Sequence, residues 1–177
     1  CMRTDGTQPV GRGIGPALEA HDILAVLQNR PDAPADLRHR AAVLAGAALE
    51  IGGATAVGTG YALALDTLAD GRAWVKFQRI CQAQGGMREP PRAPYIRPLV
   101  AARAGRVVQI DNRKLAQLAK LAGAPEAKVA GVYMDVMLGA DIIDGQPLLH
   151  LYAETAGELA YAMAYASRNP DIIEIGI

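Results

Sequence analysis

Apolar residues recur every three or four positions through the first half of the chain, which is the spacing of amphipathic helices. Glycine, proline and asparagine divide this pattern into four segments. We predict helices that begin at Pro16, at about Ala35, after Gly58-Thr59 and near Trp74, and that end before Asn29, at Ile51, at Gly71 and at Gly85-Gly86. Residues 1–15 are rich in glycine and lack this periodicity, so we predict an irregular loop there.

The second half of the chain has a different pattern, in which short β-rich runs alternate with turn residues. The predicted strands are 99–104, 106–110, 129–138, 141–143, 147–152 and 172–177. Two helices interrupt them, one at 112–122 with Asp111 as its amino-terminal cap, and one that follows a capping box formed by Thr155 and Glu158. The dipeptide Asp144-Gly145 is typical of a β-hairpin.

Four prolines lie between residues 87 and 98, where they exclude a helix or a central strand and predict an extended connector. We therefore predict an α+β protein with a helical part at residues 1–86, a linker at 87–98 and a second, α+β domain at 99–177.

Composition narrows the class of protein. Half of the residues (51%) are apolar, and 18 basic residues balance 18 acidic ones, so nothing favours a nucleic-acid partner. No apolar run approaches the roughly 18 residues that span a bilayer, so we expect no membrane segment. The two cysteines, Cys1 and Cys81, form no disulfide framework or metal-binding spacing, and we expect a cytoplasmic protein with free thiols.

Three stretches resemble the thymidine and pyrimidine-nucleoside phosphorylase family, in particular its longer branch, which includes AMP phosphorylases. The first is residues 4–20, TDGTQPVGRGIGPALEA, and the second is residues 77–86, FQRICQAQGG. The third comprises GRVVQIDNR at 105–113, LAGAP at 121–125 and GQPL at 145–148. They occur in the family's order and cover the whole chain, which therefore resembles the family's carboxy-terminal portion.

This resemblance implies the helical tail of an α/β phosphorylase domain followed by a barrel-sandwich-like, or α/β-hammerhead, carboxy-terminal domain. The implied activity of the parent enzyme is phosphorolysis of thymidine to thymine and 2-deoxy-α-D-ribose 1-phosphate, as part of pyrimidine nucleoside salvage. The family's phosphate- and base-binding residues precede the first motif. We therefore expect no catalytic residue in this chain, no activity from it alone and no required cofactor. The parent is expected to be a homodimer that binds phosphate and a pyrimidine nucleoside through its upstream part.

Some family members hold a potassium ion through two backbone carbonyls and a carboxylate. Carried over to this sequence, these ligands are the carbonyls of Val10 and Gly13 and the side chain of Asp22. Oxygen atoms of these kinds suit such a hard cation. Here Asp22 replaces the glutamate that is usual in the family, and an ordinary solvated aspartate near a helix start is the competing interpretation.

The other chemically suggestive residues have structural interpretations. Gly11, Gly13 and Gly15 precede a helix and so offer a weak phosphate-cradle signal. Glu19 suits a structural role at the helix start, and His21, His39 and His150 are too far apart in sequence to suggest a metal site.

The sequence leaves open two alternatives to a fragment of a thymidine phosphorylase. AMP phosphorylase performs the same class of reaction on a nucleotide, and the residues that would distinguish the two substrates lie upstream. The other alternative is a stand-alone, non-catalytic barrel-sandwich module. A reading frame that continues upstream with phosphate-binding motifs would exclude it.

Overall fold

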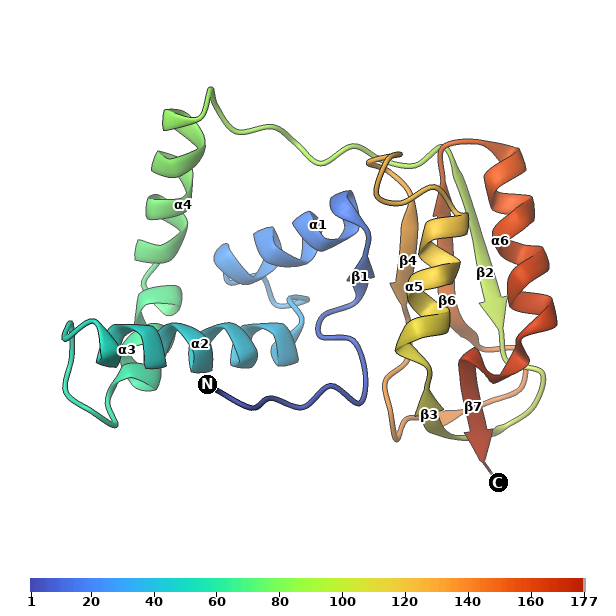
Figure 1. The fold of residues 1–177 in the computed structure, drawn as a ribbon, viewed down its shortest axis with the longest axis horizontal. Coiled ribbons are helices and arrows are strands. Elements are labelled where there is room, and N and C mark those ends of the chain that lie inside the picture. Colours follow the sequence, from blue (N-terminus) through green and yellow to red (C-terminus); the bar gives the residue numbers. More distant parts are fainter. Residues whose placement is uncertain (177) are drawn as a thin grey trace. The chain divides into compact units, whose positions relative to one another are not determined.

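The computed structural model describes residues 1–176 and divides the chain into two compact units (Figure 1). The first unit contains Cys1–Ala20 together with the chain from Pro90 onward, and the second contains His21–Glu89. The opening residues are predicted to belong with the helices that follow them, whereas the structure packs them in the carboxy-terminal unit. The predicted domain limits at 86 and 99 refer to a larger enzyme and stay a prediction.

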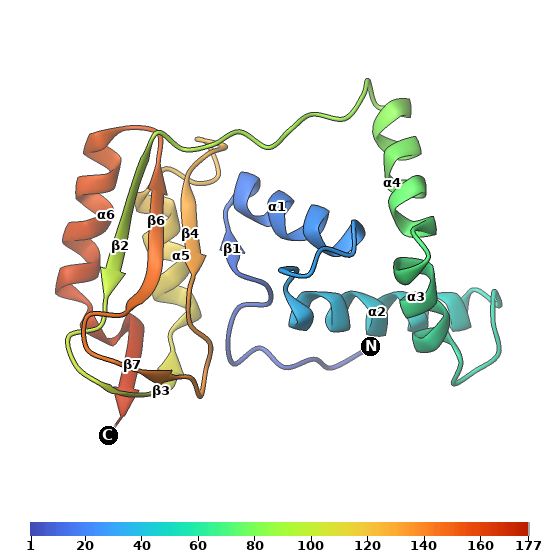
Figure 2. The same ribbon diagram turned by 180° about the vertical axis from the view of Figure 1, so that it is seen from behind.

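Two antiparallel sheets form the framework of the first unit. The four-stranded sheet has the order β1-β4-β6-β2, and its strands are β1 (Gly13–Ile14), β4 (Gly131–Met134), β6 (Pro147–Ala153) and β2 (Tyr95–Val100). The three-stranded sheet has the order β5-β3-β7, and its strands are β5 (Asp141–Ile142), β3 (Gly105–Ile110) and β7 (Ile173–Gly176). Figure 2 shows the long strands β6 and β2 side by side.

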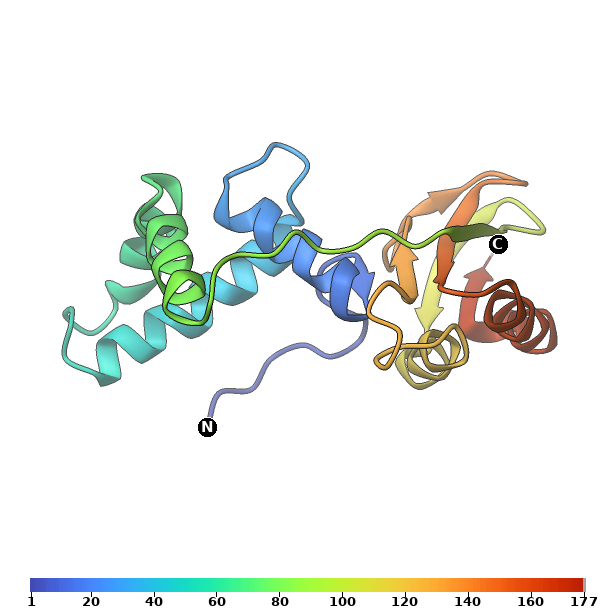
Figure 3. The same cartoon turned by 90° about the horizontal axis from the view of Figure 1, so that it is seen from above.

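Two helices, α5 (Asn112–Leu121) and α6 (Ala156–Arg168), pack on the four-stranded sheet, and Figure 3 shows them next to each other on the same side of it. Both begin at side-chain caps. The Asp111 carboxylate accepts hydrogen bonds from the backbone of Arg113 and Lys114, and the capping box of Thr155 and Glu158 is present. These caps satisfy amides that have no partner within a helix, which explains why both starts were predicted correctly. A short 3-10 helix, Pro170–Ile172, leads into β7.

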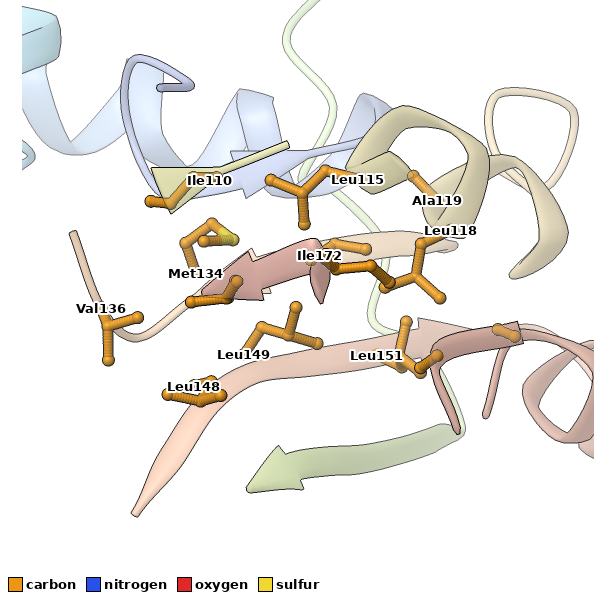
Figure 4. Packing of buried hydrophobic residues seen from close by; sticks show 14 of the residues in the cluster. Ile110, Leu115, Leu118, Ala119, Met134, Val136, Leu148, Leu149, Leu151 and Ile172 are labelled. Atoms are coloured by element: carbon orange, nitrogen blue, oxygen red, sulfur yellow. The ribbon is translucent and has the colours of Figure 1, made fainter. Parts of the chain in front are cut away.

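The hydrophobic core of the first unit lies between these helices and the sheets. Leu115 and Leu118 project from α5 toward Leu149 and Leu151 of β6, and all four side chains are completely buried (Figure 4). Alternation explains the strand contribution, because Leu149 and Leu151 point to the same face of β6. The remaining large, fully buried side chains belong to the same core and are Met134, Ile172, Val107 and Val132.

The second unit is helical. It contains most of α1 (Pro16–Leu27), together with α2 (Ala35–Ile51), α3 (Gly60–Ala69) and α4 (Arg72–Ala83). Asn29, in the left-handed conformation after α1, donates a hydrogen bond to the carbonyl of Leu68 near the end of α3 (2.5 Å). Its side chain therefore ties the ends of two helices together. None of the described helices is long and apolar enough to cross a bilayer.

The α+β class and all six predicted α-helices are confirmed, but three local predictions are wrong. Residues 13 and 14 form β1 rather than loop, because β4 provides a strand for them to pair with. Residues 95–98 were predicted to be extended connector, whereas they belong to β2. This is an edge strand, where the missing N–H of Pro98 is tolerated. Asp144-Gly145 makes a turn but no hairpin, because β5 and β6 enter different sheets.

Candidate functional site

The glycine-rich loop at residues 4–16 carries the most specific motif of the sequence, and the structure fixes it to the first unit at three points. The carbonyl of Gly6 accepts a hydrogen bond from the side chain of Asn112 (2.8 Å), and the Gln8 side chain accepts one from the backbone of Leu138 (2.8 Å). The carbonyl of Arg12 accepts one from the backbone of Met134 (2.8 Å). The loop is therefore a built part of the carboxy-terminal unit.

The glycines of this loop allow the chain to approach β4 closely. Gly15 has a φ of 128°, and a Cβ there would collide with the carbonyl of Ala130. Gly131 on the facing strand has a φ of 155°, and a Cβ there would collide with the carbonyl of Ile14. Backbone proximity on both sides explains these glycines without a ligand.

The amides at the start of α1 already have protein partners. The Gly15 N–H donates to the Glu19 carboxylate (3.0 Å), and the Ala17 N–H donates to the carbonyl of Lys128 (3.0 Å). A phosphate cradle needs such amides to point at the anion. The structure therefore disfavours that interpretation of Gly11, Gly13 and Gly15 and assigns Glu19 the structural role that was expected.

Two of the three predicted potassium ligands belong to the first unit and one belongs to the second. Val10 is half-buried in the loop and Gly13 is buried in β1, both in the first unit, whereas Asp22 lies on the part of α1 that belongs to the second unit. Asp22 is 7% exposed and is the one buried charged side chain among residues 1–176. A buried carboxylate requires compensation by hydrogen bonds or positive charge, and a cation is one form of it. The potassium site stays a prediction.

One pair of polar side chains could not be recognised from the sequence. His150 on β6 and Asp135, which directly follows β4, are joined by a hydrogen bond of 2.7 Å between Nδ1 and a carboxylate oxygen. Such a partner fixes the orientation of the imidazole ring. Their contact depends on the pairing of β4 with β6, which places His150 opposite Tyr133. No short-range sequence signal predicts this register.

Tyr152 lies two residues beyond His150 on the same face of β6. Partial burial raises the pKa of its hydroxyl, and the nearby negative charge of Asp135 raises it further. His150, Asp135 and Tyr152 form a small polar group on this sheet. Among residues 1–176, no three histidine, cysteine, aspartate or glutamate side chains are grouped so that they could hold a metal ion.

The chain is therefore an α+β protein, and its most specific sequence motif is held against β4 of the four-stranded sheet. The chain matches no model of a protein family. It is 71% identical over 175 residues to a protein of Chelativorans sp. (strain BNC1) named "Putative thymidine phosphorylase". It is also 60% and 59% identical to proteins of the same name from Tolumonas auensis and Parvibaculum lavamentivorans.

These matches cover 99% of the chain but only 34% to 35% of each relative, so the chain spans about a third of the length of the curated relatives it matches. The predicted resemblance is confirmed. The chain is similar to the carboxy-terminal part of these relatives, which carry the name "Putative thymidine phosphorylase".

Proposed function

We propose that this chain is the carboxy-terminal part of a pentosyltransferase that phosphorolyses thymidine. Phosphate would attack the anomeric carbon of the sugar, the glycosidic bond would break, and thymine and 2-deoxy-α-D-ribose 1-phosphate would be released. The observation that carries the proposal is the identity of 59% to 71% with relatives of that name over nearly the whole chain. No observation supports AMP phosphorylase as the alternative.

The groups that bind phosphate and the base would lie in the preceding part of the polypeptide. Two features support this division of roles. The amides of the glycine-rich loop named above are used within the protein, and the second unit lacks large side chains that are completely buried. The described chain would then support the catalytic part without touching the reacting atoms, and it would be inactive alone.

The direct experiment compares this chain with the whole polypeptide encoded by its gene. Thymine release is measured with thymidine and phosphate, with phosphate omitted, and with AMP in place of thymidine. We expect phosphate-dependent thymine release from the whole polypeptide and none from this chain. Adenine release from AMP without thymine release from thymidine would overturn the substrate assignment.

Potassium is the cation we propose for the site of Val10, Gly13 and Asp22. The chemistry of the three positions supports it, because carbonyl and carboxylate oxygens are the hard ligands that such a cation requires. Replacing Asp22 with Asn in the whole enzyme should raise the potassium concentration required for half-maximal rate. Asp32→Asn is the matched control, since Asp32 is exposed and paired with Arg30. Equal potassium requirements for the two variants would contradict the proposed site.

Three further features belong to this proposal. The barrel-sandwich, or α/β-hammerhead, description of the carboxy-terminal domain is supported by two antiparallel sheets with two covering helices. A cytoplasmic location is supported by the free thiols of Cys1 and Cys81. The parent enzyme is also proposed to be a homodimer, and its mass in solution would test this.

A further inference from the structure

A groove of about 610 Å³ runs over the second unit, between α2, α3 and the first turn of α4. Its lining is almost entirely apolar, and alanine is the commonest residue. The lining includes four alanines of α2, Leu63, Ala64 and Leu68 of α3, and Ala73 of α4. Small side chains along such a groove allow the backbone of another segment to approach closely.

The polar groups at the groove are already occupied. The Thr67 hydroxyl donates a hydrogen bond to the carbonyl of Leu63 (2.7 Å), and the Arg72 guanidinium pairs with Asp70 (2.7 Å). Neither residue requires a charged or polar ligand. The groove therefore suits an apolar polypeptide segment better than a polar small molecule.

The second unit also lacks a core of its own. The large, completely buried side chains of the described residues all belong to the first unit. In the second unit the buried apolar side chains are small or few, namely Ala25, Val26, Ala42, Ala64 and Leu68. At the same time Leu44 is 47% exposed and Ile51 is 89% exposed. A helical unit normally buries its apolar side chains against another element.

We propose that this groove is the docking surface for the preceding part of the same polypeptide. The inference rests on the proposed function, because it requires a chain that continues upstream. About two thirds of each relative's length lies outside the match, since the match covers 34% to 35%. That length would supply a partner at a fixed ratio of one to one. A second copy of this chain is the competing occupant.

Thiol accessibility tests the proposal. Ala45→Cys places a thiol in the exposed part of the groove wall, and Gln78→Cys places one on an exposed polar position of α4. Both substitutions are made with Cys1 and Cys81 replaced by serine, in this chain and in the whole polypeptide. We expect maleimide to label Ala45→Cys about tenfold or more slowly in the whole polypeptide than in this chain, because labelling then requires local opening. Gln78→Cys should be labelled at similar rates in both.

A second variant tests the same surface without an introduced thiol. Ala45→Trp fills the groove, so it should lower the melting temperature of the whole polypeptide while leaving that of this chain unchanged or raised. Equal labelling of Ala45→Cys in both proteins would overturn the docking surface. Protection that appears in this chain alone and grows with its concentration would assign the groove to a second copy.

The outcome also separates this inference from the proposed function. A whole polypeptide that phosphorolyses thymidine while Ala45→Cys stays accessible would overturn the docking surface only. A whole polypeptide in which Ala45→Cys is protected but thymidine is not cleaved would overturn the proposed function only.

Discussion

Gly46 of α2 and Gly60 of α3 lie against each other where the two helices cross, with backbone directly on backbone. A Cβ at position 46 would stand 2.5 Å from the backbone nitrogen of Tyr61, and a Cβ at position 60 would collide with the carbonyl of Gly46. The Gly60 N–H donates to the Glu50 side chain (2.8 Å), which fixes the same crossing. This close contact fixes the packing of α2 against α3 in a unit whose described residues include no large, completely buried side chain.

Replacing Gly46 with alanine should therefore destabilise the second unit. Alanine normally stabilises a helix interior relative to glycine by up to about 1 kcal/mol. Here the added methyl group meets backbone that has no side-chain freedom to yield, and overpacking of this kind costs about 1–3 kcal/mol. Trp74 in α4 is the one tryptophan of the sequence, so its fluorescence reports unfolding of this unit in urea.

Gly157→Ala is the matched control for this prediction. Gly157 also lies in a helix, but its nearest neighbour to an added Cβ, the Thr155 hydroxyl, is 4.0 Å away. This substitution should leave the Trp74 transition unchanged. A Gly46→Ala protein as stable as the unsubstituted chain would show that the helix crossing adjusts more easily than the geometry indicates.

The contact between Gly15 and the backbone of Ala130 leads to a second prediction. Gly15→Ala should release the loop from β4, because the substitution combines a left-handed backbone conformation with a collision against a carbonyl. Hydrogen exchange should then accelerate at the Met134 amide, which donates to Arg12, while the Leu151 amide in the central strand β6 stays protected. Gly6→Ala is the control, since nothing lies within 4 Å of a Cβ there. Unchanged exchange at Met134 would contradict this account of the motif.

The sequence predicted the helices better than the strands for a local reason. Helix limits depend on nearby residues, such as the Asp111 cap and Gly71, whose φ of 81° marks the break between α3 and α4. Strand limits depend on a distant partner. Proline cannot occupy a central strand, which predicts a linker at Pro98, yet Pro98 lies in the edge strand β2 paired with β6.

The candidate site could be predicted only in part for the same reason. The motif at residues 4–20 identified the family, but its glycines became interpretable only when β4 was placed against them. The pair formed by His150 and Asp135 depends likewise on strand register. Contacts between residues far apart in sequence arise from topology, and no local pattern encodes them.

The cap of α5 provides a third prediction. Asp111 accepts hydrogen bonds from the amides of Arg113 (2.9 Å) and Lys114 (3.0 Å). Asp111→Ala should lower the free energy of unfolding by about 1 kcal/mol, because two amides lose their acceptor. Urea unfolding followed by far-ultraviolet circular dichroism measures the change. Asp111→Asn should lose less, since its side-chain oxygen can still accept, and equal losses from both variants would argue against a capping role.

The ion pair between Lys114 of α5 and Asp171 of the 3-10 helix leads to a prediction about pH. The hydrogen bond from Lys114 lowers the pKa of Asp171 below its usual 3.8, and the same bond raises the pKa of Lys114 above its usual 10.5. A lowered carboxyl pKa adds stability above its unfolded value, and this contribution is lost as pH falls through the folded value. A raised amine pKa adds stability that is lost only as pH rises above 10.5. The pair therefore stabilises the fold most between these limits.

Lys114→Met removes the ion pair while retaining an unbranched side chain of similar length. The melting temperature of this variant should be lower than that of the unsubstituted protein at pH 7, by a small amount because the Asp171 side chain is more than half exposed. The difference should shrink as pH falls from the usual pKa of Asp171 through its lowered value in the folded protein, since protonation progressively removes the carboxylate charge. Asp171→Asn should show the same trend, and adding salt at pH 7 should reduce both differences. A difference that stayed constant from pH 7 to pH 3 would assign the effect of Lys114→Met to side-chain packing instead.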